Sequence, residues 1–455
     1  MRSPLRHGRD VPPQRSARAA HRGDHRSAAT AGSPPRRLPS RARRRSIRRP
    51  VRPRPRRSSP PPDPDDTPKC RHFGTCGGCS LLDQPIRWQL HDKLAAAEKL
   101  LAPFLAGQRI ACDEPDRAPR HFRTRLLYPV RADRDGLPVV GIYEFQSHKL
   151  VRIEECKTQD VWLTDLGKAM ETILREQRVQ PYSPSSQRGV AKAVWARLAS
   201  GTGEVLAGVV TRPGTFPQGP AFAEALTKAA RTLPYGRFAR ELVGVVHSIS
   251  DRDDEFLLGD RHVPLRGRDH VVDRRDDLDF RISAGSFYQV HAAASALLYA
   301  PAMALCGDVK GQRIVDGYGG VGGFGLRLAR RGAAEVTIVE DNEAACRDAE
   351  HNAKKNGLAA VRVLPQPYAS AQLPEKPDLL VVDPPRAGLG EKGVLRTLRS
   401  QPRRILYVAC AADSLARDLG ALCASGYRVT AARLCDLFPH TEHVELMVRL
   451  EAAGS

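Results

Sequence analysis

The second half of this 455-residue chain predicts an α/β fold built on a doubly wound parallel sheet. From about residue 282 onward, short apolar runs alternate with helical stretches, which is the rhythm of repeated strand–helix–strand units. The strand candidates are residues 314–320, 335–340, 377–385, 403–410 and 427–436. A glycine-rich turn follows the first of them, and acidic residues end two others, at the sheet edge where such folds bind ligands. We expect three parts: residues 1–67, 68–275 and 276–455.

The net charge of +21 belongs mainly to the N-terminal tail. Residues 1–60 hold 19 Arg and 2 Asp, so they carry +17 and the remaining residues carry +4. A segment rich in Arg, Pro and Ser buries too little apolar surface to offset the entropy of ordering, so we expect residues 1–67 to be disordered. Such a tail adds salt-sensitive affinity for nucleic acid. A dispensable extension, a misassigned start codon or a transit peptide are the alternative explanations.

Residues 68–275 predict an α+β region. An amphipathic helix is expected over residues 88–105 and another near residues 163–178. Between about residues 123 and 271, short alternating segments such as Glu-Val-Leu-Ala-Gly-Val-Val-Thr indicate strands. No apolar run is long enough to cross a bilayer and no secretory leader is visible, so we expect a cytoplasmic monomer with no membrane partner.

Ten cysteines in an intracellular chain indicate metal binding or catalysis rather than a disulfide framework. Five of them stand alone in apolar or helical context, where we expect small hydrophobes. They are Cys112, Cys306, Cys346, Cys423 and Cys435. Cys70, Cys76 and Cys79 share one tight loop, and Cys156 is the best candidate for a fourth ligand. Four thiolates suit either zinc or an iron–sulfur cluster.

The run Val315 to Phe324 is rich in glycine, follows an apolar strand and opens a helix. Glycines there let a ligand approach the backbone, and the helix start offers free N–H groups. The next strand ends at Glu340, where an acid commonly binds ribose hydroxyls, although a solvated charge or a helix cap explains it as well. Asp383 ends the following strand candidate before two prolines, where it can bond a cofactor or a base.

Cys410 ends a strand and precedes a helix that is expected near Asp413. A strand-end cysteine is more often a core residue than a nucleophile, but a helix N-terminus lowers a thiol pKa and favours the nucleophile. The next strand candidate carries a dense polar patch over residues 438–445. Strand alternation places His443 and Glu445 on one face, and a carboxylate on a nearly buried strand suits a general base.

Six motifs in this order resemble the RNA uracil-C5 methyltransferases, especially the branch that modifies 23S ribosomal RNA. They are the cysteine loop, SFYQVH, DGYGGVGGFG, VDPPRAG, YVAC and FPHTEHVE, and they cover about residues 68–455. The resemblance implies a Rossmann-like, S-adenosylmethionine-dependent methyltransferase domain over residues 276–455. It also implies RNA as the substrate and a [4Fe-4S] cluster in preference to zinc.

The resemblance assigns Cys410 as the nucleophile and Glu445 as the general base. The cofactor contacts that it implies are Gln289, Tyr318, Glu340 and Asp383. The cluster ligands that it implies are Cys70, Cys76, Cys79 and Cys156. In the implied mechanism the thiolate adds to uracil C6, C5 takes the methyl group, and the base removes the C5 proton. The uracil must leave its stack to meet a thiol, so base flipping is expected.

Three positions depart from the family's usual residues. Gly319 stands where cysteine is frequent, His291 stands where asparagine is usual, and Ala411 stands where asparagine commonly follows the nucleophile. These departures change neighbouring groups and leave the reacting ones in place. Three alternatives stay open: a transfer RNA substrate, a methyltransferase of another substrate class, and a non-catalytic RNA-binding protein with a cluster.

Overall fold

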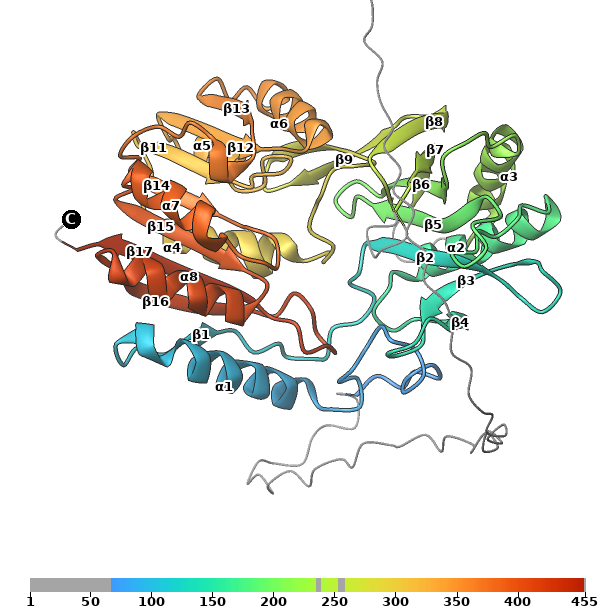
Figure 1. Ribbon diagram of the computed structural model, residues 1–455, viewed down its shortest axis with the longest axis horizontal. Helices are drawn as coiled ribbons and strands as arrows, with labels where there is room; N and C mark the ends of the chain where they lie inside the picture. The colour runs from blue at the N-terminus through green and yellow to red at the C-terminus, as the bar shows by residue number, and fades with distance from the viewer. Residues whose placement is uncertain (1–66, 235–238, 253–257, 454–455) are drawn as a thin grey trace, which may run out of the picture. The chain divides into compact units, whose positions relative to one another are not determined.

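The computed structural model describes residues 67–234, 239–252 and 258–453 (Figure 1). The prediction of a disordered tail over residues 1–67 therefore falls, except for Thr67, outside the described residues. Within the described residues, no helix combines the length and the apolar character that a membrane span requires.

The C-terminal part forms an eight-stranded sheet in the order β1-β16-β17-β15-β14-β11-β12-β13. Its strands are β1 (Ala111–Cys112), β11 (Arg313–Gly317), β12 (Glu335–Glu340), β13 (Val361–Pro365), β14 (Leu379–Val382), β15 (Arg404–Ala409), β16 (Tyr427–Cys435) and β17 (Glu445–Ala452). β17 runs antiparallel to both its neighbours, and all other pairs are parallel. The predicted doubly wound α/β fold is confirmed.

Helices cover both faces of this sheet. They are α4 (Ala300–Cys306), α5 (Gly325–Arg330), α6 (Glu343–Lys355), α7 (Gly390–Ser400) and α8 (Ala412–Ala424), with the π-helical turn η2 (Ser295–Tyr299) and the short 3-10 helix η3 (Tyr368–Ser370). One core contains Ile338 and Val381 with residues of α4, α5 and α6, and a second contains Val339 and Leu380 with residues of α7 and α8. Because both faces are covered, the central strands are continuous apolar runs, as their sequence indicates.

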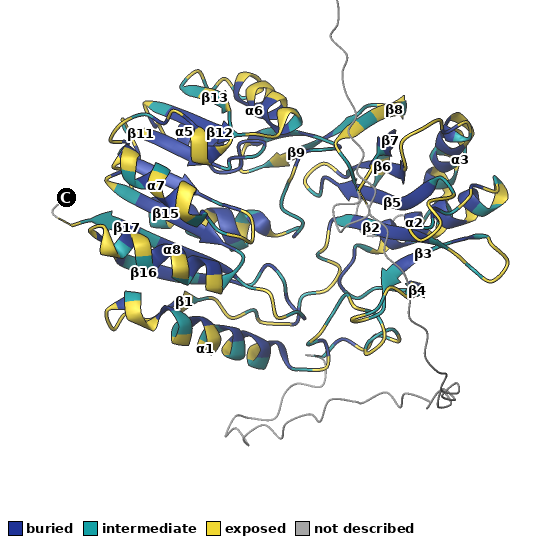
Figure 2. Cartoon of the chain, in the orientation of Figure 1, coloured by how far each residue is buried: buried dark blue, intermediate teal, exposed yellow. Residues whose placement is uncertain are grey.

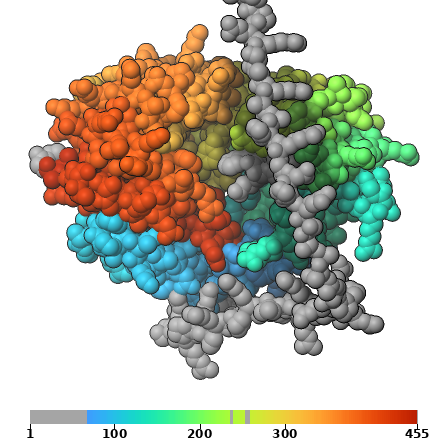
Figure 3. Space-filling view, in the orientation of Figure 1, coloured from blue at the N-terminus to red at the C-terminus, as the bar shows by residue number. Residues whose placement is uncertain are grey.

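The helix predicted over residues 88–105 is confirmed as α1 (Ile86–Leu105), which begins two residues earlier. It packs on α8 and β16, and the short strand β1 that follows pairs with β16 in parallel. Figure 3 shows α1, in light blue, on the surface beside the C-terminal residues in red. The first described helix therefore belongs structurally with the last strands of the chain.

A second, seven-stranded sheet has the order β4-β3-β2-β5-β6-β7-β8. Its strands are β2 (Arg125–Ala132), β3 (Pro138–Tyr143), β4 (Leu150–Arg152), β5 (Ala191–Leu198), β6 (Glu204–Thr211), β7 (Glu241–Ile249) and β8 (Arg261–Gly267). Helices α2 (Val161–Glu176) and α3 (Gly219–Thr232) enclose a third core with this sheet. Figure 2 shows the resulting buried centre of β5 and β6 in dark blue.

The hairpin of β9 (His270–Arg275) and β10 (Leu278–Ser283) lies between the two sheets in the sequence. It contacts β6 on one side and α6 on the other. Buried side chains of the hairpin, such as Phe280, share one core with Trp195 of β5 and Ile314 of β11. The two sheets are therefore joined through a continuous apolar core.

Candidate active site

The candidate site residues from several strands meet at one edge of the eight-stranded sheet. Cys410, Asp383 and the loop after Gly317 follow the carboxyl ends of the adjacent parallel strands β15, β14 and β11. Glu340 ends β12 on the far side of β11. Because β17 is antiparallel, its first residue Glu445 lies at the same edge, where Leu446 pairs with Ala409. The sheet order thus aligns all five groups, as expected for ligand sites of open α/β sheets.

The thiol of Cys410 is half-buried between β15 and α8. Burial, together with the carboxyl groups of Glu445 and Asp383, raises its pKa to about 11, although Arg386 acts in the opposite direction. The expectation that the helix N-terminus lowers this pKa is therefore wrong for the free protein. Burial and two neighbouring acids outweigh the helix, whose first turn also carries the acidic Asp413.

Two carboxyl groups with raised pKa face this thiol. Glu445 is 3% exposed, and burial together with Asp383 raises its pKa well above the usual range. Burial also raises the pKa of Asp383 to about 7. Acids with a raised pKa can take up and release protons during a reaction, and such shifts are common at functional sites.

The polar patch before Glu445 differs from the expected strand. β17 begins at Glu445; residues 441–442 form a bend, and residues 443–444 belong to no helix or strand. His443 is exposed, with its Nδ1 atom 3.4 Å from Nη2 of Arg386, so it does not share a strand face with Glu445. The expectation of strand alternation there is wrong because the chain turns at His440, which has a positive φ of 67°. Arg386 is a neighbour of the thiol that the sequence analysis did not single out, although its VDPPR motif marked the position.

The glycine loop holds Tyr318 and Glu340 near each other. Tyr318 has a positive φ of 62°, a strained conformation that is common at ligand sites, and its ring packs against Tyr368. The Gly320 N–H donates to Oε2 of Glu340 at 2.9 Å. Asn342, not Glu340, caps helix α6, so the helix-cap explanation of Glu340 is excluded. Burial raises the pKa of Glu340.

The structure accounts for Gly319. A Cβ atom there would lie 2.6 Å from Cγ2 of Ile338 and 2.9 Å from Oδ2 of Asp316, closer than real contacts allow. Asp316 is completely buried, accepts the Gly325 N–H at 2.7 Å and has its pKa raised to about 7 by burial. The sequence analysis did not single it out, although an acid that begins the glycine loop is a usable signal.

Gln289 lies half-buried on the loop that follows Ser286. Two bonds fix this loop: Asp348 accepts from the Ser286 hydroxyl at 2.6 Å, and the Val290 carbonyl accepts from the Thr124 N–H at 2.8 Å. His291 is 6% exposed and stacks on Phe122 with ring centroids 4.6 Å apart. Burial lowers the pKa of His291 to about 4, so a neutral ring occupies the position where asparagine is usual.

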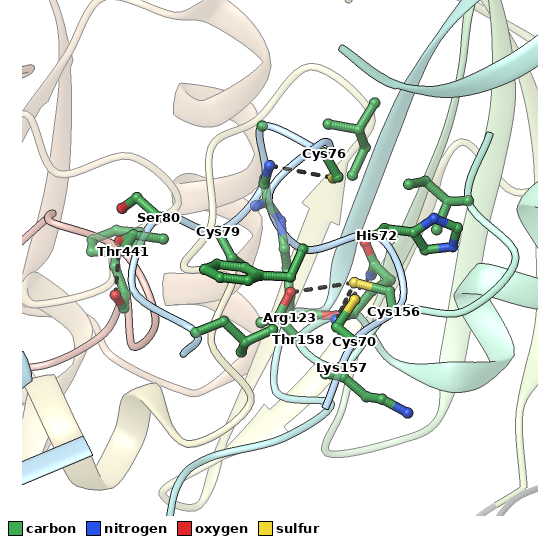
Figure 4. A pocket seen from close by; sticks show the side chains of 18 of the residues that line it. Cys70, His72, Cys76, Cys79, Ser80, Arg123, Cys156, Lys157, Thr158 and Thr441 are labelled. Carbon is green, nitrogen blue, oxygen red and sulfur yellow. Dashed lines mark hydrogen bonds between the residues drawn. The ribbon is translucent and has the colours of Figure 1, made fainter. Parts of the chain in front are cut away.

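The four cysteines predicted to be ligands line one cavity of about 400 Å³ (Figure 4). Burial raises the pKa of Cys76 and raises that of Cys79 to about 12, and the neighbouring thiols raise both further. Backbone N–H groups of Gly78 and Gln159 donate to the sulfurs of Cys76 and Cys156, at 3.4 Å and 3.3 Å. Across the described residues, no three His, Cys, Asp or Glu side chains converge in the arrangement of a single-ion site.

Gly77 shows why the cysteine loop needs glycine. A Cβ atom there would lie 2.8 Å from the Tyr143 carbonyl oxygen, which accepts the Gly77 N–H at 2.9 Å. The loop therefore lies directly against the end of β3. Thr441, Glu442 and His443 line the same cavity from the opposite direction, so the four thiols lie near the segment that leads into Glu445.

Two family models match the C-terminal part of the chain. The model described as tRNA (Uracil-5-)-methyltransferase matches residues 376–453, which include β14, β15 and β17. The model described as Conserved hypothetical protein 95 matches residues 300–406. The first match therefore includes the strand ends that carry Asp383, Cys410 and Glu445.

Relatives and a solved structure cover most of the chain. An RNA methyltransferase from Halalkalibacterium halodurans is 31% identical over 405 residues, which cover 86% of this chain and 84% of the relative. One from Caldanaerobacter subterraneus is 30% identical over 397 residues, with 84% of each chain covered. The Pyrococcus abyssi tRNA (uracil-54, C5)-methyltransferase, solved with S-adenosyl-L-homocysteine, matches with a TM-score of 0.65 and 27% identity over 82% of this chain and 84% of that one.

The doubly wound fold and these full-length relatives define an RNA methyltransferase. Within that class, the chain belongs to the RNA uracil-C5 methyltransferase family.

Proposed function

We propose that this enzyme methylates C5 of a specific uridine in 23S ribosomal RNA through a covalent bond between Cys410 and uracil C6. The observation that carries the proposal is the grouping of this thiol with two high-pKa carboxyl groups, Asp383 and Glu445, at one sheet edge. A nucleophile next to acids with a raised pKa suits a reaction that both adds and removes a proton.

The glycine loop beside this group suits S-adenosylmethionine. Gly320 has open space around its Cα atom, and Glu340 lies at the strand end where an acid binds ribose hydroxyls. The Pyrococcus relative was solved with the demethylated product of this cofactor. When bound, S-adenosylmethionine supplies the electrophilic methyl group. We propose that it is held by Gln289, Tyr318, Glu340 and Asp383.

Cys410 performs the first step of the proposed mechanism. Its thiolate adds to C6 of the flipped uracil, which places negative charge on C5 and O4 and makes C5 a nucleophile. Because the pKa of the thiol is about 11, its proton must pass to solvent, to which the half-buried sulfur is partly exposed, as the S–C6 bond forms; Arg386 favours the ionised form.

Glu445 performs the last step. After methylation, C5 carries both a methyl group and a proton, and the carboxylate removes that proton. The C5=C6 double bond then re-forms and the thiolate leaves. A raised pKa makes Glu445 a stronger base once it has lost its own proton.

We propose that Cys70, Cys76, Cys79 and Cys156 hold a [4Fe-4S] cluster. The support is their shared cavity, together with the two backbone N–H groups that already donate to sulfur. Such hydrogen bonds stabilise ionised thiolates and accompany clusters of this kind. Nothing in the proposed methylation needs an electron, so the cluster's role is structural or in RNA contact. Anaerobic purification followed by visible spectroscopy and metal analysis separates iron from zinc.

The choice of 23S ribosomal RNA rests on the cysteine loop, which resembles that of the ribosomal branch. A transfer RNA substrate is the second candidate, favoured by the TM-score of 0.65 to a tRNA enzyme. Mapping 5-methyluridine by mass spectrometry in a deletion strain and in its complemented strain decides between them. We expect one 23S position to lose its methyl group, whereas loss confined to tRNA would establish the second candidate.

The covalent mechanism has its own test. Glu445→Gln should retain the bond to RNA, visible as a shifted band on a denaturing gel, while Cys410→Ala should give no such band. Full turnover by either variant would contradict the assignment of both residues.

A further inference from the structure

The segment of residues 436–444, which we call the base loop, leads directly into Glu445. Strand pairing fixes Glu445 and the residues after it, since Glu445 pairs with Cys435 of β16, and Leu446 and Met447 pair with β15. The base loop itself belongs to no strand, so its own contacts determine how the chain enters β17. Within the base loop, His440 makes more of these contacts than Asp436 or Phe438 does.

His440 has no exposed surface and adopts a positive φ of 67°. Residues other than glycine rarely adopt this conformation, and they keep it only where surrounding contacts enforce it. Glycine would reach the same backbone angle without strain. The histidine must therefore contribute through its side chain.

Every polar group of His440 has a partner. Its N–H donates to Oε1 of Gln89 at 2.8 Å, and its carbonyl oxygen accepts from the N–H groups of Ser80 and Leu81, both at 3.0 Å. On the ring, Nε2 lies 2.8 Å from the Pro119 carbonyl oxygen. Since a carbonyl only accepts, Nε2 carries the proton. Nδ1 lies 3.3 Å from Nε2 of Gln89, whose two hydrogens are shared among Nδ1 and the carbonyl oxygens of Gln84 and Leu81, at 2.7 Å and 2.9 Å.

These partners come from parts of the chain far from the base loop. Ser80 and Leu81 directly follow Cys79, the third thiol of the cysteine loop. Gln89 belongs to α1, as does Lys93, whose ammonium group bonds Asp436 at 2.7 Å and the Phe438 carbonyl at 3.0 Å. The base loop is thus attached through three of its residues: Asp436 and Phe438 bond α1, and His440 bonds both α1 and the residues that follow the cysteine loop.

We propose that His440 is a positioning residue that holds Glu445 against Cys410 and Asp383, and that it links this carboxyl group to the cysteine loop. This role rests on the proposed function of Glu445 as the base. Only residues 441–444 separate the two, so a shift at His440 strains the pair of Glu445 with Cys435 at the start of β17 and displaces the carboxyl group. A displacement of about 1 Å in a reacting group can slow a reaction about 100-fold.

A misplaced Glu445 affects one step of the reaction. Addition of the thiolate to C6 and transfer of the methyl group to C5 need no action by Glu445. Release does: the carboxylate takes the C5 proton, the electron pair of that C–H bond forms the C5=C6 double bond, and the C6–S bond breaks to return the thiolate to Cys410. The covalent protein–RNA intermediate therefore still forms, and its release is slowed.

The test compares His440→Asn, Gln89→Met and Glu445→Gln in the full-length holoenzyme. Asparagine tolerates the positive φ, so the first variant mainly removes the contacts of the imidazole ring, such as the bond to the Pro119 carbonyl. Gln89→Met keeps the volume of the side chain and removes its hydrogen bonds. His91→Asn is the matched control, because His91 also lies on α1 but is largely exposed.

We expect His440→Asn and Gln89→Met to lower kcat about 10- to 100-fold, to leave KM for RNA within twofold and to accumulate the covalent intermediate on denaturing gels. His91→Asn should match the wild type. A fall in turnover without accumulation, or one proportional to the folded fraction, would overturn the inference. If His440→Asn is insoluble, Gln89→Met alone decides. If Glu445→Gln itself accumulates no intermediate, the proposed mechanism fails instead.

Discussion

The sheet-edge site and the cysteine cavity each bring several groups that can lose a proton close together. The two sites differ in the secondary structure that carries these groups and in the hydrogen bonds around them. At the sheet edge, Cys410 and two carboxyl groups stand at the ends of strands, and burial raises the pKa of all three. In the cavity, four thiols stand on loops, and backbone N–H groups point at two of the sulfurs. At the sheet edge, the raised pKa values suit groups that hold protons and exchange them in a reaction. In the cavity, the N–H groups suit thiols that lose their protons permanently when a cation binds.

The largest expected effect separates the two regions by activity. Cys410→Ala should lower methyl transfer by about 10⁴-fold or more, because no other group at the described sheet edge can form the bond to C6. Transfer of radiolabelled methyl groups to RNA measures it. Cys423→Ala, at the far end of α8, is the control and should retain wild-type activity. Comparable activity in both variants would contradict the assignment of Cys410 as the nucleophile.

The next effect concerns the cavity. Cys156→Ser should lose most of the bound iron and the visible absorbance, because three thiolates hold a cluster more weakly than four. Cys112→Ser should retain both, since Cys112 is also half-buried but lies on β1. Iron content per chain after anaerobic purification is the measurement. One zinc ion per chain in the wild type, with no iron, would contradict the cluster and show that the four cysteines bind zinc.

A smaller effect tests proton retention at the sheet edge. Because the pKa of Cys410 is about 11, its alkylation by iodoacetamide should rise about tenfold per pH unit from pH 7 to 10 without levelling off. Glu445→Gln removes an acid that raises this pKa, so alkylation at pH 9 should become several-fold faster. Peptide mass spectrometry follows Cys410 alone. A plateau of the alkylation rate near pH 8 in the wild type would show that the Cys410 thiol is already ionised there, and would contradict the raised pKa.

The smallest effect is on stability. The pKa of Asp383 is about 7 in the folded protein, above its ordinary value, so the associated stability is present below about pH 4 and is lost as the pH rises through 7. Asp383→Asn should therefore stabilise the protein at pH 8, on the order of 2 kcal/mol or a few degrees in Tm. The gain should vanish towards pH 4. Thermal melts across this range test the sign, and destabilisation at pH 8 would contradict it.

Local patterns predicted where the strands that carry the sheet-edge residues end. The sequence located the end of β15 at Cys410, the acid at the end of β12 and the helix α1, because continuous apolar runs and helical periodicity mark such elements directly. The sequence also predicted that Cys156 lies near the cysteine loop, because three thiols on one loop need a fourth ligand whatever the fold is. β13 was missed because it is an edge strand of five half-buried or exposed residues.

Effects that depend on tertiary surroundings escaped prediction. The pKa of Cys410 depends on burial and on carboxyl groups that lie far away in the sequence. The turn at His440 broke the strand pattern through a positive φ that its neighbours enforce. Likewise, the short strand β1 is recognisable only through its partner β16.

The bonds from Ser80 and Leu81 to the His440 carbonyl join residues about 360 positions apart. A ribosome makes the cysteine loop early and Glu445 almost last, so these contacts form only when synthesis is nearly finished. Contacts of such sequence separation are slow to form. Until then the nascent chain lacks Glu445, the proposed base, and the contacts of His440, so on the proposed mechanism turnover begins only when synthesis is almost complete.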